Sequence, residues 1–316
     1  MSTKVIAPFL LTPSELKSAV ASPDAGKKVV TLDASWHMPN SPRRGDEEFR
    51  AKHLPGAHFL DLDAVASPHG LGLKHMMPSP EQFAKACQGF GITPDTHVVI
   101  YDSHGIFSAP RALFMFRAFG HTSSSVLDGG LPRWEAEGQP VEMVETEVKQ
   151  TDEAKYPPPA YDASVVKSYE QIVSNAELDP SVDSAASLVV DARPKGRFIG
   201  QDPEPRSGLP SGHIPNAFSL PFSTFLQQRT APSGVAYTTF LPPDGLRKAL
   251  VDAIGEKNAK DVLEGRRPII ASCGSGMTAG ILWLGLRILG ADKPTLYDES
   301  WTGYALRKES NIVKDV

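Results

Sequence analysis

The sequence predicts an α/β protein in which one unit, a parallel sheet flanked by helices, occurs twice. Short apolar runs of strand length alternate with helix-length segments along the 316 residues of the chain. Such alternation is typical of parallel sheets whose strands are joined by covering helices. The order of strands, turns and helices in the first half also recurs in the second half. Length and repeat together indicate two domains of one fold.

Composition restricts the classes of function. The chain has 32 basic and 37 acidic residues, a net charge of -5, and no basic block, which argues against direct binding to nucleic acid. Hydrophobic residues at 41% and charged residues at 22% are typical of a globular protein. Two cysteines argue against a disulfide scaffold and suit a reducing compartment. No apolar run approaches the roughly 18 residues that suggest a membrane span.

The first half supplies the elements of one unit. Pro13 after Thr12 begins a helix, because proline is favoured in the first helical turn. Apolar runs bounded by turn residues predict buried strands. In chain order the predicted elements are a helix at 12–20, a strand at Val29–Asp33, a turn with a short alternating strand at His53–Asp63, a helix from Ser79, a strand at His97–Asp102, a helix at Ala112–Phe119 and a strand at Ser125–Asp128.

The second half repeats this order with recognisable counterparts. Four segments pair with earlier ones: Leu188–Arg193 with Thr31–Ser35, Gly212–Leu220 with Lys52–Leu60, Ile269–Cys273 with Val98–Asp102, and Leu296–Trp301 with Val126–Leu131. A charged stretch that contains Pro157–Pro159 separates the halves, as expected of an interdomain linker. We therefore predict an N-terminal domain at 1–145, a linker at 146–163 and a C-terminal domain at 164–316.

The most informative stretch follows the predicted strand at Ile269–Ile270. Cys273 ends that strand, Gly274 and Gly276 allow a tight loop, and a helix begins near Thr278. Backbone N–H groups converge in such a loop, and the start of a helix adds positive potential. Both effects favour a thiolate, which is the nucleophilic form of cysteine. We therefore predict that Cys273 is the reactive centre.

Spacing tests other kinds of site at this loop. A cysteine-based phosphatase needs an arginine six residues after its cysteine, where this chain has Ala279. A nucleotide P-loop needs Gly-Lys-Ser/Thr at the helix start, and no lysine is present there. A zinc or dithiol site needs a nearby second cysteine, but Cys87 lies far upstream and is expected on the core face of a helix. A buried, unreactive cysteine is the plain alternative, and the flanking glycines disfavour it.

The run Cys273-Gly-Ser-Gly-Met-Thr-Ala279 resembles the active-site loop of the 3-mercaptopyruvate sulfurtransferases, which are relatives of rhodanese. Met277 stands where that family usually has valine. Thiosulfate-preferring rhodaneses typically carry two basic residues directly after the cysteine, whereas this chain has Gly274 and Ser275. The resemblance implies two tandem rhodanese-like domains and favours 3-mercaptopyruvate as the sulfur donor.

The repeat also bears on which half does chemistry. Asp102 occupies the position in the first half that Cys273 occupies in the second, and a carboxylate cannot carry a transferable sulfur. The resemblance therefore implies that the N-terminal domain is catalytically silent. Neither a metal nor an organic cofactor is required by these residues.

The resemblance also implies a set of substrate-binding residues. The arginines of Gly-Arg-Phe and Glu-Pro-Arg bind the donor in the family, and they correspond to Arg197 and Arg206. Guanidinium groups suit a small carboxylate donor, although exposed loop arginines are also common. Arg193, nearer the strand end, is expected to be structural. The remaining predicted substrate-binding residues are those of the loop itself, Gly274, Gly276, Met277 and Thr278.

Three further residues are predicted to assist catalysis. His75 and Asp63 match family positions proposed to help the cysteine, and a histidine oriented by a carboxylate can move the protons of this reaction. A plain surface histidine is the alternative for His75. Ser275 is suited to relay a proton or bind substrate, but serine is also a good turn residue. His53 and His213 occupy equivalent places in the repeats, and we assign both to structure.

The predicted activity is transfer of sulfur from 3-mercaptopyruvate, through a Cys273 persulfide, to a thiol acceptor such as thioredoxin, a small thiol or cyanide. The alternatives are a thiosulfate:cyanide sulfurtransferase, a relay protein that passes its persulfide on for tRNA thiolation or molybdenum-cofactor assembly, and a non-catalytic binding module. No membrane partner is expected. Residues Met1–Pro8 show neither a secretory signal nor an arginine-rich presequence, which favours the cytoplasm with mitochondria as the alternative.

Overall fold

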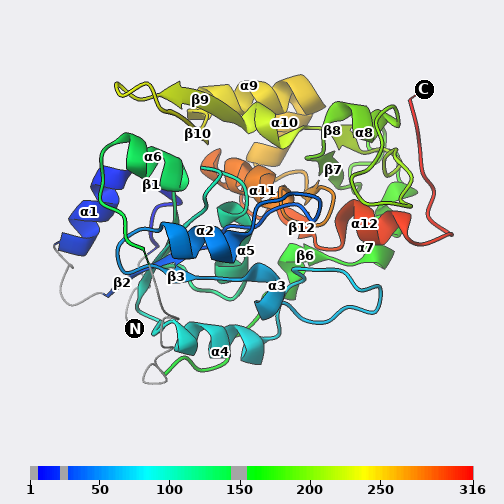
Figure 1. Ribbon diagram of the computed structural model, residues 1–316. Helices are drawn as coiled ribbons and strands as arrows, with labels where there is room; N and C mark the ends of the chain where they lie inside the picture. Colours follow the sequence, from blue (N-terminus) through cyan, green and yellow to red (C-terminus); the bar gives the residue numbers. More distant parts are fainter. Residues whose placement is uncertain (1–5, 22–27, 144–154, 316) are drawn as a thin grey trace. The chain divides into compact units, whose positions relative to one another are not determined.

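The described protein contains two five-stranded parallel sheets, one for each half of the repeat. A computed structural model describes residues 6–21, 28–143 and 155–315 (Figure 1). The strand order is β1-β5-β4-β2-β3 in one sheet and β6-β12-β11-β7-β8 in the other, so the two orders are equivalent. The pairings of both sheets are parallel. The predicted α/β class and the internal repeat are confirmed.

The first sheet lies within helices from the first half of the chain. Its strands are β1 (Leu10–Leu11), β2 (Val29–Asp33), β3 (His58–Phe59), β4 (His97–Tyr101) and β5 (Ser124–Leu127). The helices are α1 (Pro13–Ala21), α2 (Gly45–Ala51), α3 (Leu62–Val65), α4 (Pro80–Gly89), α5 (Ala109–Ala118) and α6 (Gly130–Ala136). Strand β4 is buried on both faces, as its continuous apolar run from Val98 requires.

The second sheet repeats this arrangement. Its strands are β6 (Val166–Lys167), β7 (Leu188–Asp191), β8 (Phe218–Ser219), β11 (Ile269–Ser272) and β12 (Thr295–Tyr297). The α-helices are α7 (Tyr169–Ala176), α8 (Lys195–Ile199), α9 (Pro243–Ile254), α10 (Glu256–Leu263), α11 (Ala279–Ile288) and α12 (Ser300–Ala305), with short 3-10 turns η2 (Ala163–Val165) and η3 (Phe222–Phe225). Strands β9 (Leu226–Thr230) and β10 (Ala236–Phe240) form a separate two-stranded sheet.

Local chemistry explains several element boundaries. Ser79 and Gln82 form a capping box at the start of α4, which carries the buried Cys87 on its core face as predicted. The predicted strand at His53–Asp63 is wrong beyond Phe59. Asp61 accepts hydrogen bonds from the N–H groups of Asp63 and Ala64, and this cap begins the helix α3.

The equivalent histidines of the repeats have equivalent structural contacts. The Nδ1 atom of His53 lies 2.8 Å from the Phe49 carbonyl oxygen, and Nδ1 of His213 lies 3.0 Å from that of Phe198. Each imidazole also stacks on the ring of the same phenylalanine. Both residues are buried, and the structural assignment of both histidines is confirmed.

Contacts divide the described chain into two compact units, each of which contains a short segment from the other half of the sequence. The first unit holds the residues up to Ser67 together with Met77–Asp162 and Gln227–Phe240. The second holds Pro68–Met76, Ala163–Leu226 and the residues from Leu241 onward. His75 therefore belongs to the same unit as Cys273.

Part of the predicted linker, residues 146–154, lies outside the described residues. Its described end packs within the first unit, where the Tyr156 hydroxyl lies 3.0 Å from Nδ1 of His121. Among the helices that the structure describes, none is long and apolar enough to cross a membrane.

Candidate active site around Cys273

Cys273 directly follows β11, and its side chain is buried, with 1% of the residue exposed. Its Sγ accepts a hydrogen bond from the backbone N–H of Gly276 at 3.1 Å. An N–H donor at this distance stabilises a negatively charged sulfur more than a neutral one. We call residues 273–279 the Cys273 loop. The sulfur is thus held against a backbone N–H of this loop.

Gly276 is required for the turn of this loop. Its φ of +85° lies in the left-handed region. A Cβ at this position would lie 2.6 Å from the carbonyl oxygen of Asp298, which is too close for any side chain. The absence of a side chain therefore lets the Gly276 amide approach Sγ.

Ser300 is a residue that the sequence analysis missed. Its Oγ accepts a hydrogen bond from the Cys273 N–H at 3.1 Å, donates to the Tyr297 carbonyl at 2.8 Å, and lies 3.9 Å from Cys273 Sγ. Ser300 is fully buried and has a φ of +50°, which is costly for a residue with a Cβ. The signal was present in the repeat, because Ser300 stands where the first half has Gly130.

The predicted substrate arginines occupy the second unit. Nη1 of Arg206 lies 3.5 Å from the position that a Cβ on Gly274 would take, so this guanidinium lies beside the Cys273 loop. Arg197 donates from Nη1 to Oε2 of Glu204 at 3.3 Å. Glu204, with a side chain only 2% exposed, also accepts from Arg193 at 2.7 Å. Glu204 therefore fixes the position of Arg197, a role that the sequence did not reveal.

Arg193 has the buried contacts of a structural residue. Its guanidinium pairs with Asp191 at 2.7 Å and lies 4.2 Å from the ring centre of Trp301. Burial by itself would lower the pKa of Arg193, but the carboxylates of Asp191 and Glu204 outweigh it and raise the pKa. This ion pair network anchors the segment that carries Arg197 and Arg206.

His75 lies against the Cys273 loop. Its Nε2 is 2.7 Å from the carbonyl oxygen of Ser275, and the imidazole is buried. Because a carbonyl oxygen only accepts, Nε2 carries the hydrogen and donates it. The φ of +46° at His75 marks a constrained backbone at this contact.

The remaining predicted residues lie in different places. Asp63 belongs to the first unit, where its Oδ2 accepts a hydrogen bond from Nε1 of Trp36 at 3.2 Å. The proposed orientation of His75 by Asp63 stays a prediction. In the second unit Ser275 and Met277 are buried within the loop, and Thr278 directly precedes α11.

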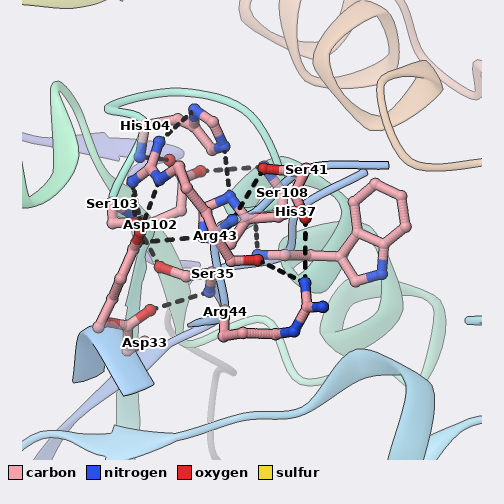
Figure 2. Close-up of polar contacts among 12 residues, drawn as sticks. Asp33, Ser35, His37, Ser41, Arg43, Arg44, Asp102, Ser103, His104 and Ser108 are labelled. Carbon is pink, nitrogen blue, oxygen red and sulfur yellow. Dashed lines mark hydrogen bonds and ion pairs between the residues drawn. The ribbon is translucent and has the colours of Figure 1, made fainter. Parts of the chain in front are cut away.

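The first unit has a corresponding loop, residues 102–108, between β4 and α5, which we call the Asp102 loop. The Asp102 carboxylate takes the place of the thiol (Figure 2). Its Oδ1 accepts from the His104 N–H at 3.0 Å, and its Oδ2 accepts from the N–H groups of Phe107, Ser108 and Ala109 at 2.8, 3.0 and 2.9 Å. The loop amides of this unit are thus occupied by a fixed anion.

The charged side chains beside the Asp102 loop are paired as well. Arg43 donates to both carboxylate oxygens of Glu48, at 2.6 and 2.8 Å. Burial would raise the pKa of Glu48, but hydrogen bonds from Arg43 and Ser103 outweigh it and lower the pKa to about 2. His104 Nδ1 accepts from Arg43 at 3.3 Å. Asp102 and Glu48 therefore supply this region with its own anions.

Within the described residues, no group of three or more His, Cys, Asp or Glu side chains is arranged to hold a metal ion.

Comparison with known proteins follows the same division of the chain. Residues 43–137 and 174–307 match the family described as "Rhodanese-like domain". The human 3-mercaptopyruvate sulfurtransferase is 35% identical over 97% of this chain and 95% of its own length. The bovine thiosulfate sulfurtransferase is also 35% identical, over 95% of this chain and 93% of its own length.

A solved structure is similar over nearly the whole chain. It is the sulfur transferase subunit, described as sub-stoichiometric, of yeast mitochondrial complex I. The TM-score is 0.78 with 29% sequence identity, and the match covers 97% of this chain and 99% of the yeast chain. Both halves of the described fold therefore have counterparts in known sulfurtransferases.

Proposed function

The chain belongs to the rhodanese family, and from that premise we propose that it takes sulfur from 3-mercaptopyruvate onto Cys273 and passes it to a thiol acceptor. Sequence identity does not distinguish between the two possible sulfur donors. The human 3-mercaptopyruvate sulfurtransferase and the bovine thiosulfate sulfurtransferase are both 35% identical to this chain. The observation that carries the proposal is the composition of the Cys273 loop. Gly274 and Ser275 follow the nucleophile where a dianionic thiosulfate would be served by cations.

Arg206 and Arg197 are the proposed contacts for the carboxylate and keto oxygens of the donor. Arg206 lies beside Gly274, close to the nucleophile, and Arg197 is held by Glu204. A guanidinium presents planar paired donors that match a carboxylate. This arrangement suits a small α-keto acid whose sulfur must lie near Cys273.

In the first half-reaction the Cys273 thiolate attacks the sulfur of 3-mercaptopyruvate. An S–S bond forms, the C–S bond of the donor breaks, and its electron pair leaves on carbon as the enolate of pyruvate. The proton of the donor thiol is transferred to that enolate carbon, so pyruvate departs and the enzyme holds a persulfide. The Gly276 N–H, which already donates to Sγ, stabilises negative charge on the attacking and resulting sulfur.

In the second half-reaction an acceptor, either a thiolate or cyanide, attacks the outer sulfur, and the Cys273 thiolate is regenerated as the leaving group. Thioredoxin, a small thiol or cyanide are the proposed acceptors. The yeast relative is described as a subunit of complex I, which supports a protein partner as a further acceptor or site of assembly. We infer a reducing compartment, the cytoplasm or mitochondria, because a catalytic thiol must stay reduced.

The proposed chemistry belongs to the second unit alone. Asp102 stands at the equivalent position of the first unit, and its carboxylate has no sulfur to exchange. The first unit would then hold no second reaction centre.

A donor comparison tests the proposal. Pyruvate release from 3-mercaptopyruvate is measured against thiocyanate formation from thiosulfate and cyanide, at matched enzyme concentration. We expect a strong preference for 3-mercaptopyruvate that is lost in Cys273→Ser and kept in Cys87→Ser, the matched control for the other thiol. A preference for thiosulfate would show that Gly274 and Ser275 do not select the donor. Activity with neither donor, together with sulfur acceptance from a protein, would favour the relay function.

A further inference from the structure

The carbonyl oxygens of the Cys273 loop are held from outside the loop. The Cys273 carbonyl accepts a hydrogen bond from the N–H of Trp301 at 2.9 Å. The Gly274 carbonyl accepts two hydrogen bonds from Thr302, one from the N–H at 2.9 Å and one from the Oγ1 hydroxyl at 2.6 Å. The first turn of α12 therefore binds two successive peptide groups of the loop.

The next peptide group is held in the same way by a side chain. The Ser275 carbonyl accepts from Nε2 of His75 at 2.7 Å. All of these residues belong to the second unit. The carbonyl groups of three consecutive residues, beginning with Cys273 itself, thus accept hydrogen bonds from donors outside the loop.

Holding a carbonyl fixes the direction of the following N–H. In a planar trans peptide the C=O of one residue and the N–H of the next point in opposite directions. The Ser275–Gly276 peptide shows the consequence, because His75 binds its oxygen and its N–H donates to Cys273 Sγ at 3.1 Å. Binding of the Gly274 oxygen by Thr302 directs the N–H of Ser275 away from α12 in the same manner.

The glycines of the Cys273 loop explain why its peptide groups need these anchors. Gly274 and Gly276 flank Ser275, and glycine rotates with little steric cost, so these peptide planes could otherwise flip. A flipped peptide would present a carbonyl oxygen to the sulfur, where a negative charge would be repelled. Two bonds from one threonine to one oxygen oppose that rotation.

The first unit provides an internal comparison. The N–H of Leu131 donates to the Asp102 carbonyl at 3.1 Å, which reproduces the bond from Trp301. The residue equivalent to Thr302 is Pro132, which has neither an N–H nor a hydroxyl. The double anchor is therefore a property of the loop that carries the cysteine.

We propose that Thr302 and His75 are positioning residues, which hold the Gly274 and Ser275 carbonyls so that the loop amides face the sulfur of Cys273 and of its persulfide. His75 acts here as a fixed hydrogen-bond donor rather than as a proton carrier. The inference rests on the proposed function only in taking Cys273 as the nucleophile.

Alkylation of Cys273 by iodoacetamide tests the role of Thr302 without any sulfur donor. The measurement is made in a Cys87→Ser background, so that Cys273 is the one cysteine left of the two in the chain. Thr302→Val keeps the shape and the N–H but removes the hydroxyl, and we expect alkylation about fivefold slower. Thr302→Ser restores the hydroxyl and is expected to react within about twofold of the wild type. Thr224→Val, which removes a hydroxyl bound to the Pro221 carbonyl, serves as the control.

Single-turnover pyruvate release separates positioning from general stability. Thr302→Val should slow the persulfide-forming step by the same factor as alkylation, while the KM for the donor stays unchanged. If Thr302→Val is alkylated at the same rate as the wild type, the proposed role of Thr302 is wrong. The same holds if Thr302→Val and Thr302→Ser are slowed equally. Because alkylation needs no donor, a wrong donor assignment leaves this result intact.

Two amide substitutions test His75. Glutamine places an N–H donor near the position of Nε2, whereas asparagine places it near Nδ1, and neither amide can carry a proton. We expect His75→Gln to alkylate several-fold faster than His75→Asn, with both variants unfolding at similar temperatures. Equal alkylation rates in His75→Gln and His75→Asn would show that His75 is not a positioning residue.

Discussion

The Asp102 loop and the Cys273 loop follow equivalent strands, and each bends at a glycine with positive φ, Gly105 at +105° and Gly276 at +85°. In the Asp102 loop, the carboxylate accepts hydrogen bonds from four backbone N–H groups and, as part of a side chain, cannot dissociate from them as a ligand could. In the second, a thiol receives one N–H and has bonding capacity left. A loop that bends at an equivalent glycine therefore holds a carboxylate in the first unit and a thiol in the second.

The side chains beside the two loops differ as well. Arg43 is paired with Glu48 beside the Asp102 loop, and Pro132 cannot anchor the second carbonyl. Beside the Cys273 loop, Arg206 lies next to Gly274, and Thr302 holds that carbonyl twice. The first unit thus places an ion pair beside its loop, whereas the second unit places Arg206 and the anchoring Thr302 beside its own.

Converting one loop into the other gives the largest expected effect. Cys273→Asp should reduce sulfur transfer by a factor of at least about 1000, because no thiolate remains to attack. The variant should nevertheless unfold at a temperature no lower than that of Cys273→Ala, since the loop amides can bind the new carboxylate as they bind Asp102. Pyruvate release and thermal unfolding check the two statements. A clearly less stable Asp variant would show that the loops are not equivalent.

Removing the fixed anion tests the first unit. Asp102→Ala leaves buried N–H groups without an acceptor, and we expect a loss of about 3–5 kcal/mol in the free energy of unfolding. Asp102→Asn keeps one acceptor oxygen and should lose less. Urea unfolding of both variants measures the difference. Equal losses would mean that the charge of Asp102, rather than its oxygens as acceptors, stabilises the loop.

The acidic residues at the ends of β2 and β7 offer a comparison by pH. Asp191 pairs with Arg193, whereas burial, with Asp102 adding to it, raises the pKa of Asp33 from 3.8 to about 7, despite hydrogen bonds from Ser35. The folded state therefore keeps a proton that the unfolded state has released. The stability contributed by Asp33 is present below about pH 4 and is lost as the pH rises toward 7.

Asp33→Asn should remove this loss. We expect the variant to be more stable than the wild type by about 4 kcal/mol at pH 8, with the advantage absent at pH 4. The free energies of unfolding of Asp33→Asn and the wild type, measured at pH 4 and pH 8, test this expectation. An advantage that does not change with pH would exclude titration of Asp33 as its source.

The turn glycines give the smallest expected effect in the first unit. Gly105→Ala must adopt a positive φ, with its Cβ 3.2 Å from the Thr238 carbonyl oxygen, and should cost about 1–2 kcal/mol. Gly276→Ala should cost more, because its Cβ would lie 2.6 Å from the Asp298 carbonyl oxygen. Thermal unfolding of both variants tests this order. A larger loss at Gly105 would contradict it.

Periodicity and repetition were sufficient for the fold. Continuous apolar runs such as Val98–Tyr101 specify strands buried on both faces, and such strands require covering helices. The error at residues 60–63 has a local cause, because Asp61 caps the helix α3 in a segment whose alternating apolar residues predict a strand.

The sequence by itself determined the class of fold, the repeat and the placement of Cys273 between a strand and a helix, because these depend on residues near one another in the chain. Only the tertiary structure decided which distant residues surround that cysteine. His75 lies 200 residues from Ser275 along the chain, and Thr302 lies 28 from Gly274. Hydrogen bonds across such separations depend on how the elements pack, and no local pattern encodes them.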